Sequence, residues 1–273
     1  MAHTLLTPAR DSAALFQSPA ALAGIERGDF YFMHNRMYAG MKGVAAINQG
    51  FISAGMPTRI GTFGFGVGMF RAAGLLEERT LAVTYARRLG SRLEVGVTGK
   101  QLYHGYLTGG DSLAAADPIF RNGRDKSAWA ADLGIIGKVT DPLRLGVTVR
   151  NLNNPDVGLV VEDRVPREIQ AGAFYDFGPR YHVRATDDVT FRDDGLASVA
   201  DRVIPAVGIE KGFADPRVVF RMGLTPLELT AGFGVRLGAV GLDYALVLRR
   251  NLVEGTMGTH MLGLRLRFGG VSR

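Results

Sequence analysis

Apolar and polar residues alternate along most of this chain, most clearly in residues 260–268. Three leucines and Phe268 fall on one face of that segment, and Gly263, Arg265 and Arg267 fall on the other, because strand side chains point to opposite sides in turn. A soluble sheet would bury the apolar face in a core. A membrane barrel turns it to lipid and keeps small or charged residues in the lumen. The pattern therefore predicts a transmembrane strand.

The same alternation recurs almost to the start of the chain, in about 14 segments whose ends are uncertain by a few residues. The segments run over residues 29–38, 43–54, 59–70, 78–88, 92–104, 127–138, 142–151, 167–177, 180–190, 202–212, 217–225, 228–237, 240–250 and 257–268. Single-chain bacterial barrels have an even number of strands. We expect an all-β fold, a closed antiparallel transmembrane β-barrel of about 14 strands, over residues 28–269.

The lengths of the connections give an independent test of this interpretation. The long connections lie near 105–126, 152–166 and 191–201, and all of them are odd-numbered when counted from the first strand. The even-numbered connections are short. Outer-membrane barrels have short periplasmic turns and longer outer loops. The chain is therefore expected in an outer membrane, surrounded by membrane lipid, with its long loops outside.

Residues 1–27 lack the strand pattern and form a separate predicted unit. A short helix capped by Asp11 and interrupted by Pro19 is expected there. The segment is too apolar for a free tail, which favours a hatch or plug inside the barrel mouth. Its candidate packing residues are Asp11, Leu15, Phe16, Ser18, Pro19 and Leu22.

Composition changes this picture only a little. The 273 residues have a mean hydropathy of +0.08 and no apolar run long enough for a spanning helix, which strands do not need. The net charge is +6, but the basic residues are scattered singly, so no nucleic acid partner is expected. The first residues lack the basic and apolar regions of a secretory signal, so we expect a mature or trimmed form.

Charged residues on the lumen side of the strands are the main candidates for function. They comprise Asp132, Arg150, Asp176, Glu210, Arg221, Asp243 and Arg249. Unpaired charges are costly in a tight interior, so the residues should pair or meet water. A salt-bridge ladder that stiffens the barrel is one interpretation. A polar pathway or docking site for a carboxylate-bearing ligand is the other, with Asp132 and Arg150 on adjacent strands as the best candidate pair.

Glycines at 64, 66 and 68 and at 232 and 234 also fall on the lumen side. Close approach of the hatch explains such positions, and a wall against a ligand explains them equally well.

No catalytic motif is present, and the five histidines are isolated, so the protein is not expected to be an enzyme. Asp111, Ser112 and Asp117 in the longest loop could hold Ca²⁺, but the ligand spacing of a calcium loop is absent. A solvated loop is favoured, so no metal and no cofactor are expected.

Several short stretches together resemble the fatty-acid-transporter (FadL-like) barrels, and more narrowly their PorV/PorQ branch. The segment from Asp11 to Ala23 is similar to the hatch motif of that superfamily, with Ser18 in place of its usual Asn. The other matching stretches are 132–136, 145–152, 208–210, 221–224, 232–234 and 242–245.

The resemblance implies three possible functions. A PorV-type protein would bind a secreted cargo protein, or other envelope secretion and attachment proteins of the type IX system, through loops 105–126, 152–166 and 191–201. A FadL-like barrel would instead pass hydrophobic small molecules such as fatty acids, from an apolar pocket near Leu15, Phe16, Leu22 and Phe174. The third possibility is a scaffold barrel in an envelope complex. Partner binding is the first hypothesis and hydrophobic uptake the alternative.

Overall fold

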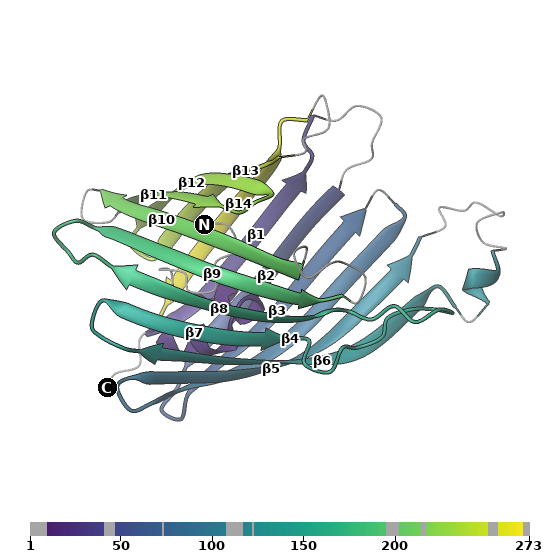
Figure 1. Cartoon of the computed structure of the whole chain (residues 1–273), viewed down its shortest axis with the longest axis horizontal. Coiled ribbons are helices and arrows are strands. Elements are labelled where there is room, and N and C mark those ends of the chain that lie inside the picture. Colours follow the sequence, from purple (N-terminus) through teal and green to yellow (C-terminus); the bar gives the residue numbers. More distant parts are fainter. Residues whose placement is uncertain are drawn as a thin grey trace.

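Fourteen antiparallel strands close into a single barrel in the computed structural model, because the first strand pairs with both the second and the last (Figure 1). The structure describes residues 10–40, 47–72, 74–107, 117–121, 123–194, 202–213, 217–250 and 256–269. The predicted closed barrel is therefore confirmed.

Each strand pairs with its neighbours in chain order. The strands are β1 Gly28–Met37, β2 Ile47–Pro57, β3 Thr62–Ala72, β4 Leu76–Leu89, β5 Leu93–Tyr106, β6 Asp125–Lys138, β7 Leu143–Arg150, β8 Arg167–Asp176, β9 Val183–Asp193, β10 Val203–Phe213, β11 Val218–Leu224, β12 Glu228–Leu237, β13 Val240–Arg249 and β14 Thr259–Phe268.

The faces of the strands follow the predicted alternation. On β3, Phe63 and Phe65 are exposed on the outside of the barrel, whereas Thr62 and Gly64 are buried on the lumen side. On β7, Val147 points outward and its neighbour Thr148 inward in the same way. A register shift of one residue would exchange these two sets, so the apolar outer surface fixes the register.

Strand β9 shows the clearest shift from the predicted boundaries, since it begins at Val183 rather than at residue 180. The backbone N–H groups of Tyr181 and His182 both donate to the carbonyl of Gly178, and His182 has a φ of 49°. These contacts extend the turn after Gly178–Pro179. The strand can begin only after the chain leaves this turn.

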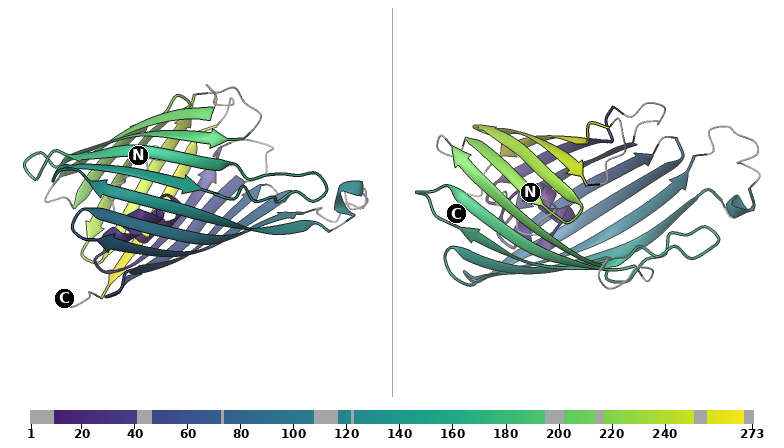
Figure 2. Two further views of the ribbon diagram at one scale, coloured as in Figure 1. Left: turned by 60° about the horizontal axis from the view of Figure 1, so that its bottom comes forward. Right: turned by 45° about the horizontal axis from the view of Figure 1, so that its top comes forward.

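Two short 3₁₀ helices precede β1 and lie inside the barrel (Figure 2): η1 Ser12–Phe16 and η2 Pro19–Gly24. We call residues 10–27 the plug. Asp11 stands at the N-cap of η1, but its side chain makes no capping hydrogen bond, so the predicted cap is wrong. The side chain faces the Arg265 guanidinium instead.

None of the described helices is long and apolar enough to cross a membrane.

The connection between β7 and β8, residues 151–166, packs against the inner face of β5 and β6 at the long-connection end. Val157 in this loop is buried and packs with Leu102 and Ala130 of the barrel wall. Asp156 accepts hydrogen bonds from the backbone N–H groups of Gly158 and Asp163, which holds the loop in shape. Part of this loop, which was predicted to contact a partner, is thus buried against its own barrel.

A third 3₁₀ helix, η3 Pro118–Phe120, lies in the connection before β6.

Candidate functional site

The plug packs against a wall made of small residues. A Cβ atom added at Gly96 would lie 2.4 Å from the backbone carbon of Pro19, and one at Gly64 would lie 2.6 Å from Leu22 Cδ2. One added at Gly66 would lie 2.8 Å from Phe16 Cζ. The lumen-side glycines at 64 and 66 therefore make room for the plug, as the hatch interpretation expects.

Leucine and phenylalanine side chains of the plug fill the space between the plug and the wall. Leu15 and Leu22 are fully buried and share a cluster with Ala82 and Ala86 of β4. Ala20 packs with the ring of Phe174 on the other side of the plug. Leu15, Leu22 and Phe174, three of the four predicted pocket residues, are therefore buried in contacts between the plug and the wall.

Buried hydroxyl groups fix the plug to the wall. Thr148 Oγ1 donates to Ser18 Oγ at 2.8 Å, so Ser18 has a polar partner although it is fully buried. The backbone N–H of Ser12 donates to Asp29 Oδ1 at 2.7 Å, and the hydroxyl of Ser12 donates to the carbonyl of Ser53. Buried polar groups need such partners, so these bonds select one docked position.

Arg265 of β14 ties the plug to the seam where the barrel closes. Its Nε donates to Asp29 Oδ2 on β1 at 2.6 Å, and its Nη2 donates to the carbonyl of Arg10 at 2.5 Å. Asp11 lies 3.8 Å from the same guanidinium. Burial raises the pKa of the Asp11 carboxyl to about 6, and the charge of Arg265 only partly opposes this shift.

Five charged side chains on the opposite wall form one continuous chain of ion pairs, which we call the charge ladder. Its members in order are Asp176 (β8), Arg184 (β9), Glu210 (β10), Arg221 (β11) and Asp243 (β13). The consecutive distances are 3.1, 2.9, 2.8 and 2.6 Å. The first four residues stand directly opposite one another in the strand register, so a single transverse row supplies most of the ladder.

The ion pair between Arg221 of β11 and Asp243 of β13 passes over β12, which has a glycine beside it. A Cβ added at Gly234 would lie 2.4 Å from Asp243 Oδ1 and 3.1 Å from Arg221 Nη1. Gly232, on the same strand, stands opposite Arg221. A Cβ at Gly232 would instead lie 2.6 Å from the Tyr244 carbonyl oxygen. Gly234 therefore makes room for an ion pair that spans two strands, whereas the plug packs on the other wall.

Asp132 and Arg150, the predicted pair, each take a different partner. Asp132 Oδ1 lies 2.8 Å from Lys100 Nζ, and Arg150 Nη2 lies 2.5 Å from Glu168 Oε2. Arg150 stands directly opposite Glu168 in the β7–β8 register, which explains why these two residues form an ion pair. Glu168 also binds Arg192, so a second charged row lies nearer the long loops.

Arg249 belongs to neither row. Its Nε donates to Glu228 Oε1 at 2.8 Å and its Nη1 donates to the hydroxyl of Tyr38 at 2.6 Å. Of the seven lumen candidates, the ladder thus unites Asp176, Glu210, Arg221 and Asp243, and the other three lie outside it.

Between the plug and loop 151–166 lies a chamber of about 370 Å³. Phe16 of the plug lines it on one side, and Val165 and Pro166 of the loop line it on another. Lys100, Arg150 and other charged groups complete its lining. The chamber is thus a mixed polar and apolar space.

The barrel wall has a gap between β10 and β11 at the long-connection end. β11 ends at Leu224, which pairs with Val207, whereas residues 203–206 of β10 pair with β9 alone among the described residues. Pro205 lies in this half-paired stretch. Proline has no N–H to donate, so it fits a strand position that lacks a partner on one side.

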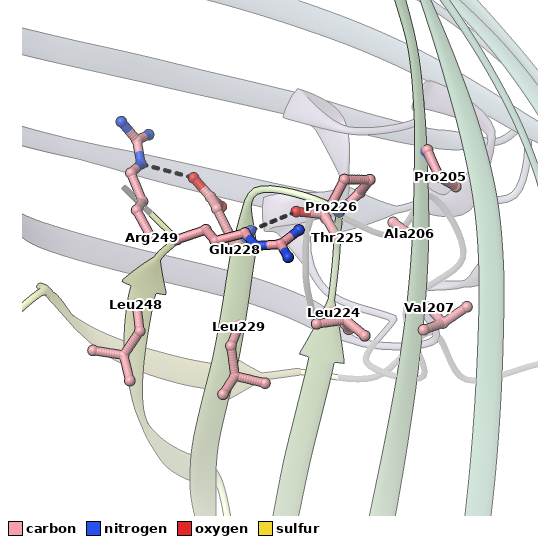
Figure 3. A pocket seen from close by; sticks show the side chains of 11 residues that line it. Pro205, Ala206, Val207, Leu224, Thr225, Pro226, Glu228, Leu229, Leu248 and Arg249 are labelled. Atoms are coloured by element: carbon pink, nitrogen blue, oxygen red, sulfur yellow. Dashed lines mark hydrogen bonds and ion pairs between the residues drawn. The ribbon is translucent and has the colours of Figure 1, made fainter. Parts of the chain in front are cut away.

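An apolar groove of about 620 Å³ occupies this gap (Figure 3). Val207, Leu224 and Leu229 line it from the outer side of the wall. Ala206 and Glu228, from the lumen-facing side, line the same groove. The groove therefore reaches both faces of the wall at the place where strand pairing stops.

Arg184 and the wall gap were not among the predicted site residues. Arg184 faces Asp176 across the short turn between β8 and β9, so opposite charges flanking a turn could have indicated the pair. For the gap, Pro205 inside a predicted strand is the available signal.

No group of three His, Cys, Asp or Glu residues that could hold a metal occurs in the part of the chain that the structure describes. Of the calcium candidates, Asp111 and Ser112 lie outside the described residues, and the Asp117 carboxylate accepts from the N–H of Ile119.

The fold matches solved transport barrels over nearly its whole length. The toluene transporter TbuX of Ralstonia pickettii aligns at a TM-score of 0.64 and 14% identity, covering 94% of each chain. The toluene transporter TodX of P. putida aligns at 0.63 and 14%, again with 94% of each chain. A FadL homologue of Pseudomonas aeruginosa aligns at 0.63 and 12%, covering 97% of this chain and 96% of the homologue.

No family model and no curated protein sequence matches the chain. At such low identities the structural matches show the fold alone, which this chain shares with the two toluene transporters and the FadL homologue. They agree with the broader resemblance seen in the sequence. They give no support to the narrower PorV-type resemblance or to a role in type IX secretion.

Proposed function

We propose that this protein lies in the outer membrane and passes hydrophobic small molecules across it without an energy source. The observation that carries the proposal is the apolar groove at the unpaired edge of β10, which both faces of the wall line. Transport by barrels of the same fold supports it, since the similar TbuX and TodX structures are described as toluene transporters. No comparable observation favours cargo binding.

The axial route is poorly suited to an apolar solute. The plug packs against β1 to β6 inside the barrel, and loop 151–166 packs against the inner face of β5 and β6. At the short-turn end, the lining of a cavity of about 210 Å³ is mostly charged, with the basic residues Arg10, Arg88, Arg92, Lys138 and Arg144 and the acidic residues Glu26 and Glu94. Desolvating charges is costly, whereas an apolar wall gap offers a solute continuous contact with lipid.

The charge ladder limits how far the gap extends. Gly208 pairs with Gly223 next to the last paired residues, and Glu210 binds Arg221 at 2.8 Å two residue pairs further from the gap. β10 and β11 are thus held together below the gap, and the opening is confined to the end near the long loops.

A charge placed in the groove tests the proposal. In cells of a Gram-negative host that lacks its own fatty-acid transporter, the protein should raise the initial uptake of radiolabelled toluene or of a fluorescent fatty acid. Leu224→Asp should abolish most of this gain, because a carboxylate in the groove must be desolvated as the solute passes. Leu262→Asp is the matched control, since Leu262 and Leu224 are 57% and 54% exposed on the same outer surface.

Equal amounts of folded barrel in the membrane must be shown first for every variant. Uptake no higher than in cells without the protein would overturn the proposal. Equal losses in the two variants would assign the effect to the lipid-facing charge and remove the groove from the route.

A further inference from the structure

Three arginines gather on the outward face of the barrel, where apolar residues are the rule. Arg36 is next to last in β1, Arg71 is next to last in β3, and Arg79 is fourth in β4. All three are exposed and lie on the strand face that carries the lipid-directed Phe32, Phe65 and other apolar residues. They also share the end of the barrel that bears the long connections.

The strand register brings these residues together. Arg36 stands opposite Asn48, Asn48 opposite Arg71, and Arg71 opposite Glu77, so one transverse row crosses four neighbouring strands. His260 extends the row on the far side of Arg36. Neighbouring strands lie about 4.8 Å apart, so Arg36 and Arg71 are separated by about 10 Å. We call Arg36, Arg71, Glu77 and Arg79 the arginine patch.

Glu77 holds two of the guanidinium groups in place. Its side chain is only 8% exposed, and its two carboxylate oxygens bind Arg71 at 3.1 Å and Arg79 Nε respectively. The side chains of Arg71 and Arg79 remain 57% and 54% exposed. The Arg79 guanidinium also lies over the Tyr103 ring, 5.0 Å from its centroid. Each arginine has five N–H donors, so both keep donors that point away from Glu77.

Arg36 is the third member and has no acidic partner among the described residues. Elsewhere on the same rim, outward-facing Arg167 is matched by Asp193 at 3.2 Å. The patch carries three positive charges and one negative charge, whereas the Arg167 pair is neutral. A lipid-facing arginine is costly at mid-depth but not at the interface, where it can meet charged headgroups.

We propose that the arginine patch binds the phosphate groups of a phosphorylated glycolipid in the outer leaflet. Guanidinium groups match phosphate oxygens with paired hydrogen bonds, and preordered arginines lose little freedom on binding. The acyl chains of such a lipid would lie on the apolar surface below the patch, formed by Phe32, Ile52, Phe65 and Met69. The inference rests on the outer-membrane orientation proposed above, but on no transport activity.

Binding of purified diphosphoryl lipid A to the full-length barrel in detergent tests this inference. Replacing Arg36, Arg71 and Arg79 together by Gln should weaken binding about tenfold or more, because charge-assisted hydrogen bonds to phosphate are lost. Arg87→Gln is the matched control: Arg87 lies on β4 like Arg79 and is exposed, but it stands at the short-turn end. This variant should bind lipid A as the unchanged protein does.

The triple variant leaves buried Glu77 without its cations, so Arg36→Gln alone is a second test that disturbs no ion pair. It should weaken binding about threefold, as expected for one exposed charge-assisted contact. Lipid A with one phosphate removed should bind more weakly than the diphosphoryl form. The folded state of each variant is checked by the heat-dependent shift of the barrel on gels.

Unchanged affinity in folded triple and Arg36→Gln variants would overturn the inference. So would equal affinity for lipid A with and without its second phosphate, which would leave acyl contacts as the cause. Full displacement of lipid A by millimolar inorganic phosphate would show a simple anion site and reject the lipid. Because the assay uses no uptake, a protein that binds lipid A but fails to transport would count only against the proposed function.

Discussion

The inner face of the barrel differs between the half that contacts the plug and the half that does not. From β2 to β6 the wall offers mainly glycine, alanine, serine and threonine to the plug, and the contacts are close and buried. From β8 to β13 the wall carries the charge ladder, whose members bind one another rather than the plug. A strand face that meets protein needs small residues, while a face without a plug needs polar groups that satisfy each other.

The difference has an energetic basis. Charges against the plug would lose water on both sides, which costs several kcal/mol per ion unless partners are well placed. On the ladder side, Arg184 and Asp243 stay partly exposed, so the cost is smaller. Substitutions in the two halves should therefore have different effects on the barrel and on the plug.

Removing the centre of the ladder should have the largest effect. Glu210 binds Arg184 and Arg221 and its side chain is 1% exposed, so Glu210→Ala leaves two cations without their shared acid. A loss of about 3 to 5 kcal/mol in the free energy of unfolding is expected for a broken buried pair. The midpoint of denaturant unfolding in detergent measures it.

The control for that prediction is Glu162→Ala, which breaks an ion pair with Arg164 at 57% exposure. Its cost should be within about 1 kcal/mol, as for surface pairs. If the two variants unfold at the same denaturant concentration, the ladder does not stabilise its half of the barrel.

Crowding the plug side should have the next largest effect. Gly96→Val puts a side chain where a Cβ already lies 2.4 Å from Pro19 backbone, so overpacking of about 1 to 3 kcal/mol should displace the plug. Gly99→Val, on the opposite face of the same strand, meets no atom within 4 Å. Protease cleavage within residues 12–24 should rise only for the first variant.

The loss of a single hydrogen bond should also affect the plug only when the bond connects the plug to the wall. Thr148→Val removes the donor to plug residue Ser18, whereas Thr230→Val removes a bond within the wall to the carbonyl of Gly223. Each change should cost about 1 kcal/mol. Hydrogen exchange in the plug should speed up for Thr148→Val and stay unchanged for Thr230→Val; a plug that responds equally to both would contradict the division.

Acidity should tighten the plug by a modest amount. Burial raises the pKa of Asp11 from 3.8 to about 6, so the docked plug binds a proton more strongly than the released plug. This stabilisation is fully present below pH 3.8 and is lost as the pH rises through about 6. The protection factors of the amides in residues 12–24, which correct for the intrinsic pH dependence of amide exchange, should be higher at pH 5 than at pH 8, and Asp11→Asn should remove the difference.

The strands could be predicted from the sequence because each one repeats a local two-residue pattern. The partners of charged residues could not, because they depend on register: Arg150 is opposite Glu168 and also beside Asp132, and only the structure decides between them. The groove at β10 depends on where β11 ends, which involves residues 17 positions apart such as Val207 and Leu224. The sequence shows where the glycines lie, but it does not show whether the plug or an ion pair occupies the space beside them.

The contact between Arg265 and Asp29 joins residues 236 positions apart, and the same Asp29 receives the Ser12 N–H. Contacts between distant parts of a chain form slowly, because a long loop must close first. The plug can complete its bonds only when the first and last strands have met. Slow hydrogen exchange of the plug amides therefore marks the end of folding. A folding intermediate in which the first and last strands have not yet paired would show fast exchange in the plug.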